Sequence, residues 1–334
     1  MFSLNELRRP VIAAPMAGGV SVPELVIAAA DAGGLGFLAA GYKSVDDVLA
    51  QAHRVRMASG DPFGVNLFMP GASANLDAAS AYRGRLAGLA VELGVELPEP
   101  YEDDDAFDAK CAALWDAPVP VVSFTFGCPG ADVIRRFRQA GTFTIATVTS
   151  VDEAAQATAS GVDALVVQGP EAGGHRGTVD AHATPPTQPL DALLLAVRAA
   201  TDLPLIAAGG LGTASAIAEA LRTVAAVQLG TAFVDADEAG TSPVHRRALH
   251  DPRFIETALT RAFSGRVARA LRNDFIDAYG PDAPPEYPAL NQLTGPLRKA
   301  AAQSGDAEIV ALWAGTSWRT TQTASVATIL DNLL

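Results

Sequence analysis

Residues 143–168, FTIATVTSVDEAAQATASGVDALVVQ, indicate the fold of this chain more clearly than any other stretch. The two ends of the stretch, residues 143–148 and 164–168, are short apolar runs, and residues 151–160 between them have a helical pattern. Strands that are apolar on both faces are typical of a parallel sheet covered by helices. The stretch therefore predicts a strand–helix–strand unit of an α/β protein.

The same unit recurs along the chain. Further strands are predicted in short apolar runs at residues 11–17, 36–40, 63–68, 119–126, 204–208 and 225–229. Helical patterns lie between these runs, at residues 23–32, 45–59, 75–93, 107–115, 131–140, 190–200 and 214–221. Eight strands that alternate with helices favour a closed (β/α)8 TIM barrel over an open sheet.

The later part of the chain has a different character. We expect the barrel in residues 1–234 and a smaller, mainly helical appended subdomain near the barrel mouth in residues 235–298. The basis for the second expectation is residues 243–273, which hold most of the later His and Arg residues and read as helical. Residues 299–334 are predicted to return to the barrel as C-terminal helices, from helical patterns at residues 297–303, 307–313 and 323–333.

Composition and charge exclude several classes of function. The chain has 334 residues and a formal net charge of −13, which disfavours binding to nucleic acid or to anionic membranes. No apolar run reaches the roughly 20 residues that a membrane-spanning helix needs. Cys111 and Cys128 lack metal-ligand spacing and fit a reducing compartment. We therefore expect a cytoplasmic protein without a metal site, and we interpret Cys128 as a small buried apolar residue.

Glycine-rich turns follow the last two predicted strands. Residues 204–212 (PLIAAGGLG) and 228–231 (QLGT) hold these turns. TIM barrels often bind phosphate at this place through backbone N–H groups, and glycine lets the backbone approach the phosphate closely. Phosphate binding is thus predicted at Gly209, Gly210, Gly230 and Thr231.

A second candidate region is residues 168–177 (QGPEAGGHRG), after the sixth predicted strand. Gln168 ends a very apolar strand, where its amide needs a hydrogen-bond partner such as the edge of a planar ring. His175 is either a proton-transfer group at a ligand or a solvent-exposed loop residue. The other histidines are expected at the surface or at helix ends, namely His53, His182, His245 and His250.

Two further strand ends offer ring-binding groups. Residues 15–19 (PMAGG) follow the first predicted strand and either face a flat ring or pack the barrel end. Asn66, at the end of the third predicted strand, either binds a ring or a ribityl group or caps a turn.

Taken together, these motifs resemble the class I nitronate monooxygenases, formerly called 2-nitropropane dioxygenases. The resemblance covers residues 15–19, 36–42 (GFLAAGY), 64–68 (GVNLF), 168–177, 228–233 (QLGTAF), 287–298 (YPALNQLTGPLR) and 312–315 (LWAG). It implies FMN as cofactor, no required nicotinamide, and O2-dependent oxidation of alkyl nitronates such as propionate 3-nitronate to a carbonyl compound and nitrite. A role in nitroalkane detoxification and a monomeric or homodimeric state are expected.

The resemblance also implies roles for individual residues. His175 matches the catalytic histidine, which orients the substrate or takes the α-proton of a neutral nitroalkane, and Tyr287 matches a substrate-pocket tyrosine. Some relatives have a lysine within the block of residues 287–298, where it could bind a substrate carboxylate. This chain has Gly295 between Thr294 and Pro296, with Lys299 further on, so Lys43 and Arg176 are alternative cations. The residues expected to contact FMN are Pro15, Met16, Ala17, Asn66, Gln168, Gly173, Gly174, Gly209, Gly210, Gln228, Leu229, Gly230 and Thr231.

Two other functions remain open at this point. One is an FMN barrel that takes hydride from NAD(P)H and reduces a quinone or an enoyl thioester, because such enzymes share the AGGH-type turn. The other is a phosphate- or flavin-binding barrel without turnover.

Overall fold

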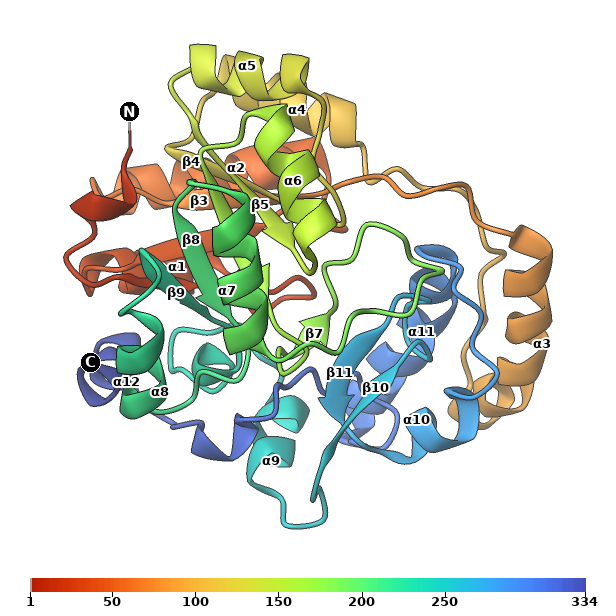
Figure 1. Cartoon of the computed structure of the whole chain (residues 1–334). Coiled ribbons are helices and arrows are strands. Elements are labelled where there is room, and N and C mark those ends of the chain that lie inside the picture. Colours follow the sequence, from red (N-terminus) through yellow and green to blue (C-terminus); the bar gives the residue numbers. More distant parts are fainter. Residues whose placement is uncertain (1) are drawn as a thin grey trace.

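Eight parallel strands close into a barrel in the computed structural model, which describes residues 2–334 (Figure 1). Their order around the barrel is β1-β2-β3-β4-β5-β6-β8-β9, and β9 pairs with β1 to close it. The predicted (β/α)8 TIM barrel is confirmed. The barrel strands are β1 (Val11–Ala13), β2 (Leu35–Ala39), β3 (Gly64–Phe68), β4 (Val121–Thr125), β5 (Phe143–Val148), β6 (Ala164–Gln168), β8 (Leu205–Ala208) and β9 (Ala226–Leu229).

The unit β5–α6–β6 shows why these residues adopt this structure. The side chain of Ser150 accepts a hydrogen bond from the N–H of Glu153 and so caps the start of α6 (Val151–Ser160). Gly161 ends the helix in the left-handed conformation, with φ at 85°. The chain then returns so that β6 pairs with β5 in parallel, and both strands have the predicted bounds.

Alternate strand residues fill the barrel interior. Ile145, Val166 and Ile206 belong to the inner cluster, whereas their neighbours in sequence pack outward against the helices. Phe2 joins the inner cluster and contacts Phe143 edge to face, with 5.5 Å between ring centroids. The interior is therefore packed rather than open.

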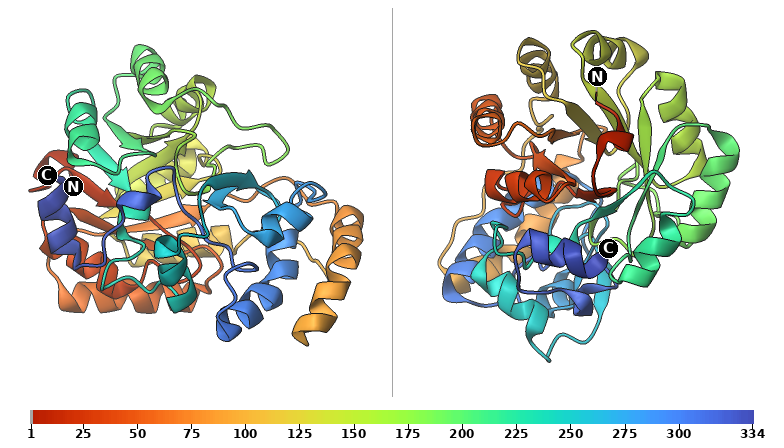
Figure 2. Two further views of the ribbon diagram at one scale, coloured as in Figure 1. Left: turned by 90° about the horizontal axis from the view of Figure 1, so that it is seen from below. Right: turned by 90° about the vertical axis from the view of Figure 1, so that its left-hand side faces the viewer.

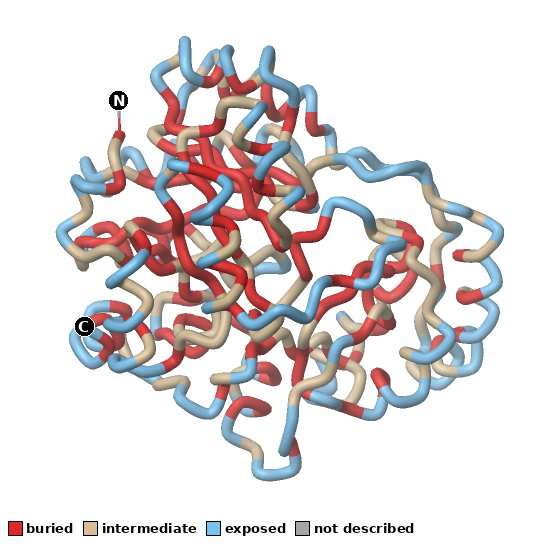
Figure 3. Tube along the Cα trace, in the orientation of Figure 1, coloured by how far each residue is buried: buried red, intermediate tan, exposed pale blue. Residues whose placement is uncertain are grey.

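Helices surround the barrel on its outside (Figure 2, right). Buried residues concentrate on the barrel strands, while the outer faces of the helices are exposed (Figure 3). No helix in residues 2–334 is long and apolar enough to cross a membrane. The surrounding helices are α1 (Pro23–Asp31), α2 (Val45–Ala58), α4 (Phe107–Asp116), α5 (Ala131–Gln139), α6, α7 (Leu190–Ala200), α8 (Ala214–Ala220) and α12 (Val326–Leu333).

A smaller part lies beside the barrel (Figures 1 and 2). It is mostly helical, as expected, and it also holds a three-stranded antiparallel sheet of order β10-β11-β7. The insertion after β3 contributes α3 to it, because α3 packs against α11 in a separate apolar cluster. Its elements are α3 (Leu76–Leu93), β7 (Gly174–His175), α9 (Pro243–His250), β10 (Thr257–Thr260), β11 (Ala268–Leu271), α10 (Asp274–Tyr279) and α11 (Ala289–Ser304).

The helical prediction for residues 243–273 is wrong beyond His250. Helix α9 ends there, two residues before Pro252, and a hairpin of β10 and β11 follows. Because β11 pairs with β7 on its other edge, a partner distant in sequence stabilises extended backbone that local composition does not indicate.

Residues 307–313 are likewise not helical, although their sequence predicts a helix. Residues 307–310 form turns and bends, and residues 311–313 run beside β11, where Leu312 O accepts a hydrogen bond from Leu271 N and Trp313 bridges to Ala270. Helix α11 passes through residue 298 without a break, so the expected boundary at this position falls within a helix. The predicted division of the chain otherwise stays a prediction.

Candidate functional site

A cavity of about 540 Å³ lies at the carboxyl ends of the barrel strands. Each of the eight strands contributes lining residues at its end or from the loop after it, and α9, α11 and residues 310–317 close the other side. The charged lining residues are Arg298 and Lys299, and residues 2–334 contribute no Asp or Glu to the wall. TIM-barrel enzymes have their active sites at this end of the barrel.

The structure brings the sequence-predicted residues together around this cavity. Segments that are up to about 200 residues apart in sequence converge there. Strand β1 ends at Ala13, and the residues after it form a loop in the cavity wall. The predicted residues that line the cavity are Pro15, Met16, Ala17, Asn66, Gln168, Gly173, Gly174, His175, Gly209, Gly210, Gln228, Leu229, Gly230 and Thr231.

The glycine turns after β8 and β9 present free donors to the cavity. Gly209 and Gly210 have φ values of 112° and 72°, a region that favours glycine. Within the described chain, the N–H groups of Gly209, Gly210 and Gly230 have no hydrogen-bond acceptor. These turns can therefore donate to an anion, as the sequence predicts.

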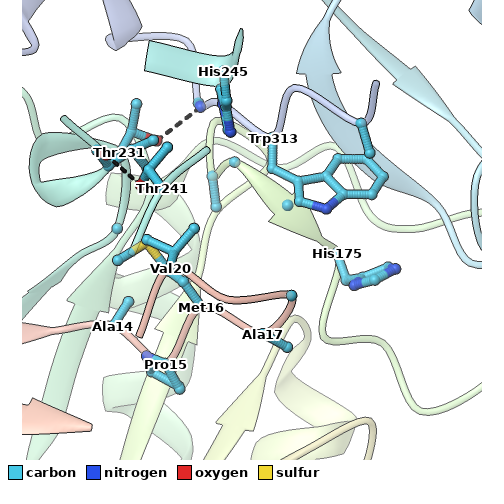
Figure 4. A pocket seen from close by; sticks show the side chains of 18 of the residues that line it. Ala14, Pro15, Met16, Ala17, Val20, His175, Thr231, Thr241, His245 and Trp313 are labelled. Carbon is cyan, nitrogen blue, oxygen red and sulfur yellow. Dashed lines mark hydrogen bonds between the residues drawn. The ribbon is translucent and has the colours of Figure 1, made fainter. Parts of the chain in front are cut away.

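His175 belongs to a strand rather than to the glycine-rich turn that the sequence suggests. It ends β7, opposite Ala268 of β11, and it lines the cavity beside Trp313 (Figure 4). The Nε2 atom of His175 lies 2.8 Å from Ser264 Oγ. The side chain is thus held in place, which excludes a mobile, solvent-exposed loop histidine.

The environment of His175 keeps its imidazole neutral. Burial, together with the positive charges of Arg266 and Arg298, lowers the pKa of His175 to about 3. Aromatic rings surround it, with centroids 5.7 Å away for Phe126 and 5.4 Å away for Trp313. A neutral imidazole has one nitrogen that accepts a proton or a hydrogen bond, so His175 can act as a base near neutral pH.

Gln168 has a different partner from the ring edge that the sequence suggests. Its Nε2 donates to the carbonyl of His175 at 3.0 Å, and its Oε1 accepts from the N–H of Gly177 at 2.8 Å. The nitrogen and the oxygen of the Gln168 side-chain amide thus both hold the loop that carries His175. Asn66 is similarly engaged, because its Nδ2 donates to Ser123 Oγ at 2.9 Å and to Thr125 Oγ1 at 3.0 Å.

Tyr287 lies just behind the cavity wall. It is not a lining residue, but its hydroxyl donates to that of Tyr42 at 3.1 Å, and its ring is 6.0 Å from the ring of His175. Tyr42 lines the cavity, although the sequence gives it no role beyond the GFLAAGY motif. A direct substrate contact by Tyr287 stays a prediction, and Tyr42 is the tyrosine that reaches the cavity.

The two predicted cations lie outside the cavity. Lys43 Nζ donates to Gln51 Oε1 at 2.8 Å, and the buried guanidinium of Arg176 donates to main-chain carbonyls, that of Gly169 among them. Neither side chain lines the wall, so this interpretation is wrong for the structure. Arg298 of helix α11 lines the cavity instead.

His245 lies in the first turn of α9, so the helix-end alternative holds for it and the surface alternative is wrong. Ser242 caps α9, and the helix buries His245 in the cavity wall near Thr231 and Trp313 (Figure 4). Burial lowers the pKa of His245 to about 4. The sequence around it, SPVHRRALH, gives a cap and an amphipathic helix but no indication of which face meets the cavity.

Comparisons with known proteins agree with this geometry. The family model described as "Nitronate monooxygenase" matches residues 3–334. A probable nitronate monooxygenase of Staphylococcus aureus (strain MRSA252) is 36% identical over 337 residues, which cover 97% of this chain and 93% of the relative. A nitroalkane oxidase from Streptomyces ansochromogenes superimposes with a TM-score of 0.94 at 47% identity and covers 99% of this chain and 97% of its own.

A more distant structure has the same fold. FabK from Thermotoga maritima superimposes with a TM-score of 0.74 at 25% identity, covering 99% of this chain and 93% of its own. A barrel with a cavity at the carboxyl ends of its strands and a half-buried, neutral histidine in the wall defines the class as a TIM-barrel enzyme. The chain belongs to the nitronate monooxygenase family, and it is an oxidoreductase.

Proposed function

We propose that this protein binds FMN in the cavity and oxidises alkyl nitronates with O2 to a carbonyl compound and nitrite. The observation that carries the proposal is the neutral, fixed imidazole of His175 in a cavity that also holds two turns with free N–H donors. The likeness to the nitroalkane oxidase from Streptomyces ansochromogenes supports the same class of substrate.

The cavity fits FMN. The N–H groups of Gly209, Gly210 and Gly230 would hold the phosphate, because they are unpaired in the described chain and follow adjacent strands β8 and β9. Pro15, Met16 and Ala17 would provide an apolar wall for the ring. FMN would supply the electron acceptor, while the protein orients the substrate beside it.

The side chains around His175 would do the remaining work. His175 would orient a nitronate, or accept the α-proton when a neutral nitroalkane binds. The hydroxyl of Ser264 fixes the imidazole through Nε2, and the rings of Phe126 and Trp313 exclude water from its surroundings. This arrangement would hold the substrate close to the imidazole, in surroundings of low polarity.

An anaerobic absorbance experiment tests the proposal. The flavin-loaded protein is mixed with propionate 3-nitronate and, separately, with NADH and with NADPH, and nitrite is then measured after O2 is admitted. We expect the nitronate to change the flavin spectrum and to yield nitrite, with no rapid change from either nicotinamide. Rapid bleaching by NAD(P)H beside an inert nitronate would instead identify a reductase of quinones or enoyl thioesters.

A further inference from the structure

The charge of the cavity wall differs in sign from that of the protein. The chain has a formal net charge of −13, yet the charged residues of the wall are Arg298 and Lys299. His175 and His245 in the same wall have lowered pKa values of about 3 and about 4, so they add no positive charge at neutral pH. The wall therefore favours an anionic ligand.

Arg298 is held in this wall with hydrogen-bonding capacity to spare. Its Nη2 donates to the backbone carbonyl of Asn291 at 3.0 Å and to Asn291 Oδ1 at 2.8 Å. Its Nη1 has no hydrogen-bond partner within residues 2–334, and no carboxylate there forms an ion pair with it. A half-buried cation without a counter-charge is unfavourable unless a ligand supplies one.

The fully buried arginines Arg176 and Arg266 are in a different situation. Arg176 and Arg266 donate to main-chain carbonyls, those of Gly169 and Thr178 among them, and neither lines the cavity. Their role is to hold loops. Arg298 combines a place in the wall with a free donor, so it is the arginine available to a ligand.

The helix that carries Arg298 also leaves room beside it. Asn291, Gly295 and Arg298 lie on one face of α11, at intervals of four and three residues, and all three line the cavity. A Cβ atom at Gly295 would meet nothing within 4 Å. The space next to the guanidinium is thus open to a ligand.

This open space is at the His175 end of the cavity. The positive charge of Arg298 acts on both His175 and Tyr42, where it lowers the pKa of each group. Asn291 and Gly295 border the same stretch of wall. The glycine turns after β8 and β9 supply separate donors for a phosphate, so Arg298 is not needed there.

We propose that Arg298, held by Asn291, binds a carboxylate at the far end of the substrate and so selects nitronates that carry a second negative charge. The inference rests on the proposed function and deepens it. A guanidinium binds a carboxylate through paired N–H donors, and such charge-assisted bonds are stronger than neutral ones. The open volume at Gly295 gives the carboxylate a place beside the guanidinium.

A substrate pair and matched variants test Arg298. Propionate 3-nitronate and propyl 1-nitronate differ in the carboxylate, and Arg298→Gln removes the proposed partner. For the variant we expect KM for propionate 3-nitronate to rise at least about tenfold, and KM for propyl 1-nitronate to change less than about threefold. Arg135→Gln removes an exposed cation outside the cavity lining, so it is the control and should change neither KM by more than about threefold.

A binding measurement separates this inference from the proposed function. Succinate has a carboxylate where propionate 3-nitronate has its nitronate group, and calorimetry measures its binding without turnover. Weaker succinate binding in Arg298→Gln supports the subsite even if no nitronate is oxidised by the parent protein. Equal losses for both nitronates, an effect of Arg135→Gln as large as that of Arg298→Gln, or unchanged succinate binding would each overturn it.

Arg298→Lys addresses the case in which the glutamine variant fails to fold. Lysine keeps the charge but loses the planar fork, so we expect a KM for propionate 3-nitronate between those of the parent protein and of Arg298→Gln. A lysine variant that loses activity on both nitronates alike would assign Arg298 to the stability of α11 and overturn the proposal.

Discussion

His175→Asn separates two roles that the structure gives to one side chain. A nitronate has already lost its α-proton, so it requires His175 for orientation alone. A neutral nitroalkane requires in addition a base that accepts this proton. Asparagine keeps a polar group near the ring position but cannot accept a proton, so the two substrates should respond differently.

The structure sets the size of each effect. A positioned general base contributes about 10²- to 10⁴-fold, or about 3–5 kcal/mol, to proton transfer. The bond between His175 Nε2 and Ser264 Oγ is worth only about 1 kcal/mol. We therefore expect His175→Asn to lower kcat/KM for nitroethane by about 10²-fold or more, and for its nitronate by about tenfold or less.

Steady-state nitrite release from the two forms of the same compound measures this ratio. Retained FMN, read from the absorbance of the purified variant, shows that the cavity is intact. Ser264→Ala is the matched control, because it removes the support of the imidazole but not the base, and it should lower both rates by less than about tenfold. Equal losses on the nitroalkane and the nitronate in His175→Asn would refute the assignment of His175 as the base.

Three further predictions follow from the same geometry. Because the pKa of His175 is lowered to about 3, its neutral form persists on acidification, and kcat/KM for nitroethane should stay level from pH 8 to about pH 5; a fall centred near pH 6.5 would contradict this. Gln168→Leu removes two hydrogen bonds to the loop that carries His175 and should lower the free energy of unfolding in urea by about 2 kcal/mol. It should also change kcat by a larger factor than KM. An unchanged unfolding midpoint would show that Gln168 does not hold this loop. Gly209→Ala places a Cβ atom 3.0 Å from Ala172 N at φ of 112°, and it should weaken FMN binding at least about tenfold in fluorescence titration. Gly141→Ala, also at a positive φ (84°) but outside the cavity lining, should only destabilise the protein. Equal FMN affinities of the two variants would refute a phosphate role for the turn.

The barrel was predictable because its signal is local. Residues 143–148 and 164–168 are apolar on both faces, and their observed strands have the predicted bounds. The hairpin in residues 257–271 was not predictable in the same way. Its strands are four residues each, and the pairing of β11 with β7 depends on residues almost 100 positions earlier.

The residues of the site likewise fall into those that local sequence predicts and those that it does not. Glycine turns and strand ends can be recognised from sequence, so Gly209, Gly230 and His175 could be placed at the barrel mouth in advance. Arg298 and His245 could not, because each sits on a helix whose inward face is fixed by packing against distant elements. In a chain where Lys and Arg occur 24 times, composition alone does not show which cation meets the cavity.

The position of Arg298 links substrate selection to the chemistry of His175. A positive charge close to the imidazole disfavours its protonated form, and burial acts in the same direction. In the free enzyme this keeps His175 unprotonated but makes it a weaker base. A bound carboxylate would neutralise Arg298 and raise the pKa of His175, so the imidazole would become a stronger base when a carboxylate-bearing substrate is in place. On this argument Arg298→Gln should also raise the pKa of His175 in the free protein, which NMR titration of the imidazole can measure, and an unchanged or lower pKa would show that the two groups are not coupled.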